Sequence, residues 1–197
     1  MRNDYQIILD IIPSNSKVLD IGCSSGELLK LLRNKDNVQT QGVEISQEKV
    51  VKCLESGLDV VQGDINQILE DFPHNQFDYC LLTQTIQTVN EPDRLLQLLK
   101  KVGKNIIISF DNSNYYRKVF EFALKGSFNN LLQNSSKEKW FNSQNIHPCS
   151  IKDFDTLAKQ LGFKVNESYD VRKNKKFIFP KTPSNIFCRE VLFNLST

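Results

Sequence analysis

The segment that most constrains the fold runs from Val18 to Gly26. Its apolar stretch Val-Leu-Asp-Ile enters a loop that carries Gly22 and Gly26, and a leucine-rich helical pattern follows. A strand, a tight turn and a helix in this order form the first unit of a doubly wound α/β sheet. Ligands of such sheets bind beyond the carboxyl ends of the parallel strands, so the segment predicts both a fold and the edge at which a ligand binds.

The charges in this loop argue against a ligand that carries phosphates. Asp20 lies near the end of the strand and Glu27 opens the helix, with no lysine or arginine between them, so a pyrophosphate would be repelled at the helix N-terminus. The two glycines fit neither the G-x-G-x-x-G spacing nor a loop that ends in Gly-Lys-Ser/Thr. A ligand with a ribose, an adenine and a cationic amino-acid tail, such as S-adenosylmethionine, would suit both the acid and the exposed amides.

Composition sets further limits. A chain of 197 residues with 40% apolar content is long enough for one two-faced α/β domain and short for two. The net charge of +2 shows no footprint for nucleic acid or an anionic membrane, and the basic run 172–176 is interpreted as a solvated turn. Five scattered cysteines without C-x-x-C spacing indicate a reduced, cytoplasmic protein. With only His74 and His147 we expect no metal site, and no apolar run approaches the ~20 residues that a bilayer demands.

Apolar bursts alternate with helical patterns along the whole chain, which is typical of parallel strands joined by crossover helices. Seven strands are expected, at 17–21, 40–44, 59–62, 77–82, 105–110, 164–171 and 186–194. A short charged segment with no room for a helix joins the last two strands, so at least one of them should run antiparallel. Apolar stripes that start at Leu95, Tyr116 and Phe154 predict helices that bury these faces in the core. The polar stretch from 127 to 145 indicates that residues 111–149 form a lid or substrate-side insertion within the single domain.

Acidic residues just after the strands are the first candidates for ligand contacts. Glu44 ends the second strand, where a carboxylate can accept hydrogen bonds from both ribose hydroxyls; an acid at the start of the helix 47–55, capped by Ser46, is the alternative. Asp64 follows the third strand and can accept from the exocyclic amine of adenine, or cap the helix 66–72. Asp20 can brace the loop amides and reach the methionyl nitrogen through water.

Later segments make the pattern more specific. They are Gln84-Thr-Ile-Gln87 after the fourth strand, Val102-Gly103 before Ile106-Ile-Ile-Ser-Phe110, and Trp140-Phe141 with Asn145-Ile-His147 before Ser150-Ile-Lys-Asp-Phe154. Together with the loop and the ordered acids, they make the chain resemble the MetW family, within the class I S-adenosylmethionine-dependent methyltransferases, from about Val18 to Phe163. The family loop usually carries a glycine where this chain has Ser24, so a side chain stands where backbone would approach the methionyl portion closely.

The resemblance implies a Rossmann-like class I methyltransferase fold: a seven-stranded, mostly parallel sheet with an antiparallel last strand and helices on both faces. It also implies S-adenosylmethionine or S-adenosylhomocysteine as the cofactor, a place in methionine biosynthesis, and homoserine O-acyltransferase as a partner that the protein supports or regulates. The cofactor-binding residues expected on these grounds are Asp20, Gly22, Cys23, Ser24, Gly26, Glu44, Ile45, Asp64, Ile65 and Thr83.

Fewer reactive side chains are expected on the substrate side of the site. Gln84 and Thr85 follow the fourth strand, where they can face a substrate or satisfy local backbone groups. Trp140 and Phe141 fit a lid over the cofactor or an anchor in a protein interface. His147 is the candidate catalytic base because histidine is the residue type most often used for proton transfer in catalysis, and a neutral histidine bonded to backbone is the alternative.

Three functions follow from these residues. The first is an S-adenosylmethionine-binding protein that supports the acyltransferase. The second is an active methyltransferase on a small molecule, for which the lack of a catalytic triad counts little because positioning carries much of an in-line methyl transfer. The third is an interaction domain that no longer binds the cofactor, which Ser24 motivates.

Overall fold

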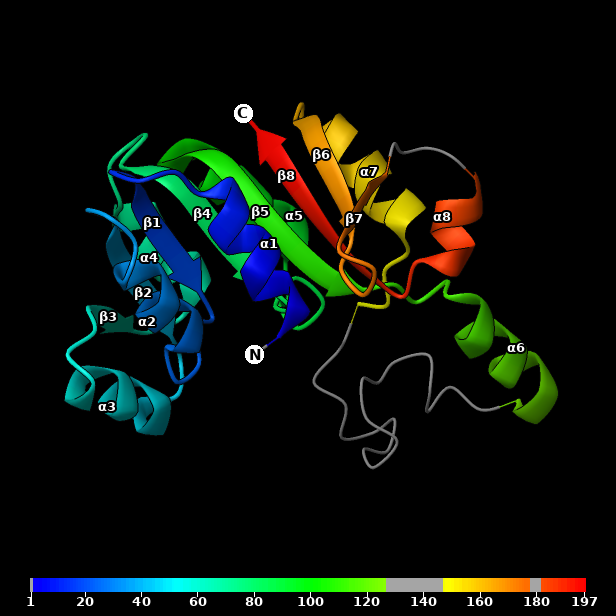
Figure 1. Cartoon of the computed structure of the whole chain (residues 1–197), viewed down its shortest axis with the longest axis horizontal. Coiled ribbons are helices and arrows are strands. Elements are labelled where there is room, and N and C mark those ends of the chain that lie inside the picture. The colour runs from blue at the N-terminus through cyan, green and yellow to red at the C-terminus, as the bar shows by residue number, and fades with distance from the viewer. Residues whose placement is uncertain (1, 127–146, 178–181) are drawn as a thin grey trace.

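The computed structural model describes residues 2–126, 147–177 and 182–197, which form one sheet with helices on both faces (Figure 1). The strand order is β3-β2-β1-β4-β5-β8-β6-β7. The strands are β1 (Lys17–Ile21), β2 (Gln39–Glu44), β3 (Val60–Gln62), β4 (Phe77–Thr83), β5 (Gly103–Asp111), β6 (Lys164–Asp170), β7 (Lys175–Phe177) and β8 (Glu190–Ser196).

Strand directions confirm the predicted fold class. The pairs β1–β2, β1–β4, β2–β3 and β4–β5 are parallel, whereas β8 runs antiparallel to both of its neighbours, β5 and β6. The expected antiparallel last strand is therefore present, inserted between β5 and β6. The carboxyl ends of the parallel strands meet at one edge, and β8 begins at that edge.

The predicted number of seven strands was wrong, because the described residues form eight. The additional strand, β7, pairs antiparallel with β6 after a tight turn in which Asn174 has a φ of 47°. It is only three residues long and two of them are lysines, so it shows no alternating apolar pattern. The basic run 172–176 thus forms the turn and the start of this strand. A short helix, α8 (Thr182–Phe187), also lies between the late strands, where no helix was expected, and the last strand begins at Glu190 and not at position 186.

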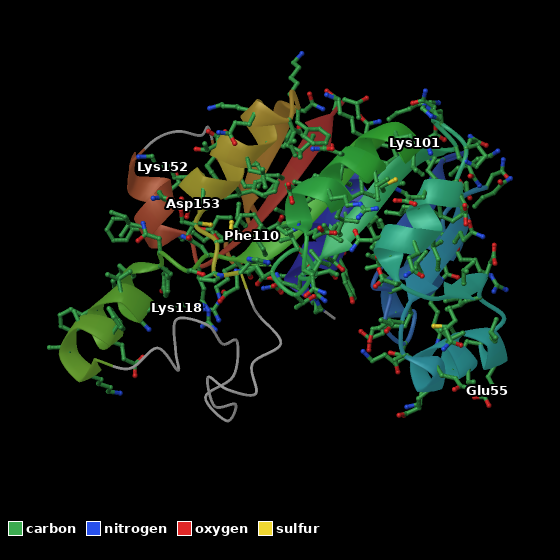
Figure 2. All side chains as sticks on the ribbon, turned by 180° about the vertical axis from the view of Figure 1, so that it is seen from behind. Glu55, Lys101, Phe110, Lys118, Lys152 and Asp153 are labelled. Atoms are coloured by element: carbon green, nitrogen blue, oxygen red, sulfur yellow. The ribbon has the colours of Figure 1, made fainter. Side chains whose placement is uncertain are left out.

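Alternation along the strands assigns the helices to two layers. Ile107 of β5 faces α1 (Asn3–Ile11) and α2 (Glu27–Arg33), while Ile106 and Ile108 face α4 (Ile65–Asp71), α5 (Pro92–Val102) and α7 (Ile151–Gln160). The helix α3 (Gln47–Glu55) packs with α2 and β3 through Val50 and Cys53. On the α7 side, the ring of Phe110 packs against Phe154 and Phe193 (Figure 2). Apolar residues two apart on one strand therefore share one core.

The first helix, α1, was not expected from the sequence. Its buried residues Tyr5 and Ile8, with Ile12 just beyond its end, repeat at i, i+3 and i+7 and pack on the sheet beside α2. In Figure 1, α1 lies in front of the sheet, and Asp4 in its first turn accepts a hydrogen bond from Ser109, near the carboxyl end of β5, at 2.9 Å. The first residues of the chain therefore reach the carboxyl edge of the parallel strands.

The helix α6 (Tyr116–Lys125) contradicts one prediction, because its apolar stripe is not a core face in the described structure. Tyr116 contacts Phe187 of α8, but Val119 and Phe120 are exposed, with Phe120 at 64%. The helix points away from the sheet (Figure 1), and only Lys118 of its residues is buried. A periodic stripe shows which face of a helix is apolar and does not show whether another element covers it. None of the helices in the described ranges is long and apolar enough to span a membrane.

Candidate functional site

The sheet face that α1 covers changes from apolar to polar at the carboxyl edge. On β1, buried Val18 is followed on the same face by Asp20, and on β5, Ile107 is followed by Ser109. On β8, which runs the other way, Glu190 precedes Leu192 at the same edge. The polar side chains are thus gathered where the fold places a ligand.

The glycine loop after β1 has a shape that side chains resist. Gly22 and Gly26 have φ values of 71° and 76°, in the left-handed region. A Cβ atom on Gly22 would lie 2.9 Å from Oγ1 of Thr85, and one on Gly26 would lie 2.3 Å from Cδ1 of Leu58. Cys23 between them is buried against α3. The loop is therefore closely packed between Thr85, which follows β4, and Leu58, which lies between α3 and β3.

Ser24 adopts the backbone conformation that a glycine would have. Its φ is 52°, which costs a side-chain-bearing residue about 1 kcal/mol. Its backbone N–H donates to Oε2 of Glu44 at 2.9 Å, and its carbonyl accepts from the thiol of Cys53. These two hydrogen bonds hold Ser24 in a left-handed conformation that glycine adopts more readily.

The side chain of Glu44 links the glycine loop to the start of α3 through hydrogen bonds. Glu44 is 5% exposed, and its two carboxylate oxygens accept the backbone N–H groups of Ser24 and Ser46, each at 2.9 Å. Ser46 begins α3 without a side-chain cap of its own, so Glu44 provides the acceptor there. Lys49 lies 4.0 Å away. An ionised carboxylate offers about four acceptor positions, so Glu44 can brace the loop and still accept from ligand hydroxyls.

The residues expected around an adenine lie next to Glu44. Gln62, which pairs with Glu44 across β2 and β3, is followed two residues later by Asp64. The Oδ1 atom of Asp64 caps α4 by accepting the backbone N–H of Asn66 at 2.8 Å, which is the helix-cap alternative. Ile65 is partly buried against the main core, whereas Ile45 leaves 67% of its surface exposed beside Glu44.

Asp20 is the group at this edge that most needs a partner. Asp20 is 1% exposed, and its Oδ1 accepts no hydrogen bond from any of the described residues. Burial raises its pKa from 3.8 to about 7; Arg2 lowers the pKa, while Asp4 and Glu44 raise it further. A buried acceptor without a donor is unfavourable and is uncommon outside functional sites. A cationic ammonium, which S-adenosylmethionine and its product both carry, fits this position.

The expected substrate side contains a polar pair that the sequence did not indicate. Gln84 has a φ of 57°, and its Nε2 donates to Oε1 of Glu190 at 2.9 Å, across β5. Burial, followed by the charge of Asp4, raises the pKa of Glu190 to about 7. Glu190 is 106 residues away from Gln84 along the chain. Only the insertion of β8 beside β5 brings the two together, so no local motif could have predicted the pair.

The other expected substrate-side residues bond to nearby backbone. Oγ1 of Thr85 donates to the carbonyl of Thr83, which is the buried last residue of β4, and packs against Gly22. His147 is exposed, and its Nε2 lies 3.1 Å from the carbonyl of Asn90, which requires that nitrogen to carry the proton. Nδ1 is then the nitrogen that can accept a proton. Trp140 and Phe141 lie outside the described residues.

Further charged groups complete this edge. Asp111, at the end of β5, pairs with buried Lys118 of α6 (Figure 2), and Arg189 lies 3.8 Å from the same carboxylate. Arg2 and buried Asp4 stand at the start of α1. The described ranges hold no cluster of three or more histidine, cysteine or acidic side chains placed to bind a metal ion.

Comparison with known proteins gives a match over nearly the whole chain. The family model described as methionine biosynthesis protein MetW matches residues 2–195. Over 193 residues the chain is 32% identical to the bifunctional methionine biosynthesis protein MetXA/MetW of Rhodopirellula baltica. The match covers 93% of this chain but only 31% of that protein. The chain therefore corresponds to about a third of that relative.

Solved structures share the fold at low sequence identity. A SAM-dependent methyltransferase from Archaeoglobus fulgidus matches with a TM-score of 0.69 and 16% identity, over 98% of this chain and 91% of that one. The cyclase SpnF matches with a TM-score of 0.67 and 14% identity, over 99% and 81%. These similarities establish a methyltransferase-like fold, and the second shows that the fold alone does not specify the reaction.

Proposed function

Because the chain belongs to the MetW family of methionine biosynthesis proteins, we propose that it binds S-adenosylmethionine or S-adenosylhomocysteine and supports a homoserine O-acyltransferase in the cytoplasm. The observation that carries the second part is the relative MetXA/MetW, in which a MetW region is joined to a MetXA region. We take the MetXA region to be the acyltransferase. Joining two proteins in one chain raises their effective concentration, which favours partners that act together.

The ligand-binding part of the proposal rests on the Oδ1 atom of Asp20, which has no hydrogen-bond partner among the described residues. Asp20 would hold the ammonium group of the ligand, and Glu44 would accept from its ribose hydroxyls with the acceptor positions that the loop amides leave. The exposed side chain of Ile45 would lie against the adenine ring, and the second oxygen of Asp64 would accept from the adenine amine. S-adenosylmethionine supplies a transferable methyl group when bound, whereas S-adenosylhomocysteine does not.

Residues 111–149 would form the substrate-side insertion of this single domain. Their described part includes α6, which leaves the sheet directly after β5 and carries Lys118 back to Asp111. Trp140 and Phe141 belong to the same insertion in this proposal. The five free thiols fit a reducing compartment.

The partnership is tested by mixing the purified chain with a homoserine O-acyltransferase from the same organism. Sedimentation measures their association, and the rate of acyl transfer is recorded with and without S-adenosylhomocysteine. We expect a complex and a changed rate. The same assay with Glu44→Ala, and with Glu48→Ala on the exposed side of α3 as a control, separates ligand-dependent support from plain association. The absence of both a complex and a rate change would end the proposal.

A working methyltransferase is the second candidate, and the Gln84–Glu190 pair favours it. With a pKa near 7, Glu190 can take a proton from an acceptor at neutral pH, and His147 could do so through Nδ1. Transfer of a labelled methyl group to candidate metabolites tests this function, with Glu190→Gln and His147→Ala assigning the base. If neither S-adenosylmethionine nor its product binds, the third function, an interaction domain without cofactor, replaces both.

A further inference from the structure

The start of α1 brings a fixed cation to the carboxyl edge of the sheet. Arg2 immediately precedes α1 and makes no cap hydrogen bond with its side chain. Its guanidinium donates from Nε to Oδ1 of Asp4 at 3.1 Å and from Nη2 to Oδ2 at 2.5 Å, and it lies 4.8 Å from the ring centre of Tyr5. Two contacts to one carboxylate hold a planar guanidinium in a defined orientation.

The carboxylate that holds Arg2 is itself fixed. Asp4 is fully buried, and its Oδ2 accepts the hydroxyl hydrogen of Ser109 on β5 at 2.9 Å. A chain of contacts therefore runs from the sheet through Ser109 and Asp4 to Arg2. The contact with Asp4 uses two of the five N–H donors of a guanidinium, and the side chain of Arg2 remains 39% exposed. Arg2 thus keeps donors for a further acceptor.

Arg2 and Asp20 are held at the same edge of the same sheet face: Asp20 lies in register with Ile107 through Leu81, and Ser109, which holds Asp4 and through it Arg2, follows Ile107 on that face. Burial raises the pKa of both Asp20 and Glu190, and the charge of Arg2 acts on both in the opposite direction. Asp20 lies on the sheet face that α1 covers, and within the described ranges its Oδ1 has no hydrogen-bond donor. The edge therefore presents an anchored cation with spare donors near a buried carboxyl with a spare acceptor.

We infer that Arg2 binds the α-carboxylate of the adenosyl amino acid whose α-ammonium Asp20 binds. An α-amino-acid group carries these two opposite charges on one carbon, which matches a neighbouring carboxylate and guanidinium. The inference rests on the proposed function and adds to it a statement of which ligands the site selects. The site requires the complete amino-acid tail and discriminates against adenosyl thioethers that lack it.

A purely structural role for Arg2, as an anchor of α1 through Asp4, would give a different ligand profile. If Arg2 only anchors α1, its substitution would loosen the whole pocket and lower the affinity for every ligand alike. If Arg2 binds the carboxylate, its substitution would lower the affinity only for ligands that carry a carboxylate. S-adenosylhomocysteine and 5′-methylthioadenosine separate the two roles, because the second shares the adenosine and sulfur of the first but lacks the amino-acid group.

Calorimetric titration of the full chain with each compound tests the inference. We expect Arg2→Gln to bind S-adenosylhomocysteine about 10- to 100-fold more weakly, the range for a lost charge-assisted hydrogen bond, and to bind methylthioadenosine within about twofold of the unmodified chain. Arg2→Lys keeps the charge and the pairing with Asp4 but loses the fork, so an intermediate loss is expected even if Arg2→Gln folds poorly. Arg94→Gln, on α5 in the opposite layer, is the matched control and should change neither affinity.

The outcomes separate the two levels of the proposal. If the unmodified chain binds neither compound, the proposed function and this inference both fall. If it binds S-adenosylhomocysteine and both Arg2 variants bind it equally well, only the inference falls. The inference is also overturned if the variants lose affinity for both compounds to the same extent, because Arg2 would then act only on α1.

Discussion

Replacing Asp20 by asparagine is expected to stabilise the free protein while weakening its ligand. Burial raises the pKa of Asp20 from 3.8 to about 7. An acid whose pKa is raised on folding contributes stability that is complete below its unfolded pKa and is lost as the pH rises to the folded value. The rise of about 3 pH units corresponds to about 4 kcal/mol of lost folding free energy above pH 7, at 1.36 kcal/mol per unit. The neutral amide in the Asp20→Asn variant would have no charge to bury.

Urea denaturation at two pH values measures this effect. At pH 8 we expect Asp20→Asn to exceed the unmodified chain in unfolding free energy by up to about 4 kcal/mol, and at pH 5 the gain should shrink to about 2 kcal/mol. Asp10→Asn, at an exposed position of α1, should show no comparable gain. The same Asp20 variant should bind S-adenosylhomocysteine at least about tenfold more weakly, because a neutral amide replaces the charged partner of the ammonium. A variant that is less stable at pH 8, or a difference independent of pH, would refute this reasoning.

Three further outcomes follow from the same geometry. Affinity for S-adenosylhomocysteine should fall about 25-fold between pH 7.5 and 5.5 in calorimetry, because only ionised Asp20 pairs with the ammonium and its ionised fraction falls as it protonates near pH 7; a flat profile would contradict this. Gly22→Ala should lower the free energy of unfolding by about 1–3 kcal/mol, since its Cβ would meet Thr85 at a positive φ, and an unchanged urea midpoint would count against that packing. Ser24→Gly should keep the ligand affinity within about threefold, because serine already has the glycine conformation, and a large gain in the same titration would show that the hydroxymethyl group obstructs the site.

Local patterns were sufficient wherever one element determines its own structure. The helix expected at 47–55 is α3 with the same bounds, and the stripe expected to start at Phe154 is a buried face of α7. The glycine loop and the carboxylate of Glu44 come together as the strand order requires. These features depend on residues within one βαβ unit, where periodicity and turn chemistry carry the information.

The features that were not predicted depend on contacts between distant parts of the chain. Arg2 and Asp4 come to lie at the ligand edge only because α1 packs beside Ser109 of β5. Glu190 reaches Gln84 only because β8 inserts next to β5. The apolar stripe of α6 was predicted to be buried and is not, because Phe120 has the spacing of a core residue but no described element covers it. Sequence spacing specifies which side chains share a face, and the tertiary arrangement decides what that face meets.

The most direct measurement of the central claim is a calorimetric titration of the purified chain with S-adenosylhomocysteine, repeated with Glu44→Ala. We expect saturable binding of one ligand per chain, and its loss in the variant, because Glu44 braces the loop at Ser24 and is the residue that we propose to accept hydrogen bonds from the ribose. Glu48→Ala on the exposed side of α3 should bind like the unmodified chain. Absence of binding to the unmodified chain, or unaltered affinity in Glu44→Ala, would contradict the assignment of this edge as an adenosyl-ligand site.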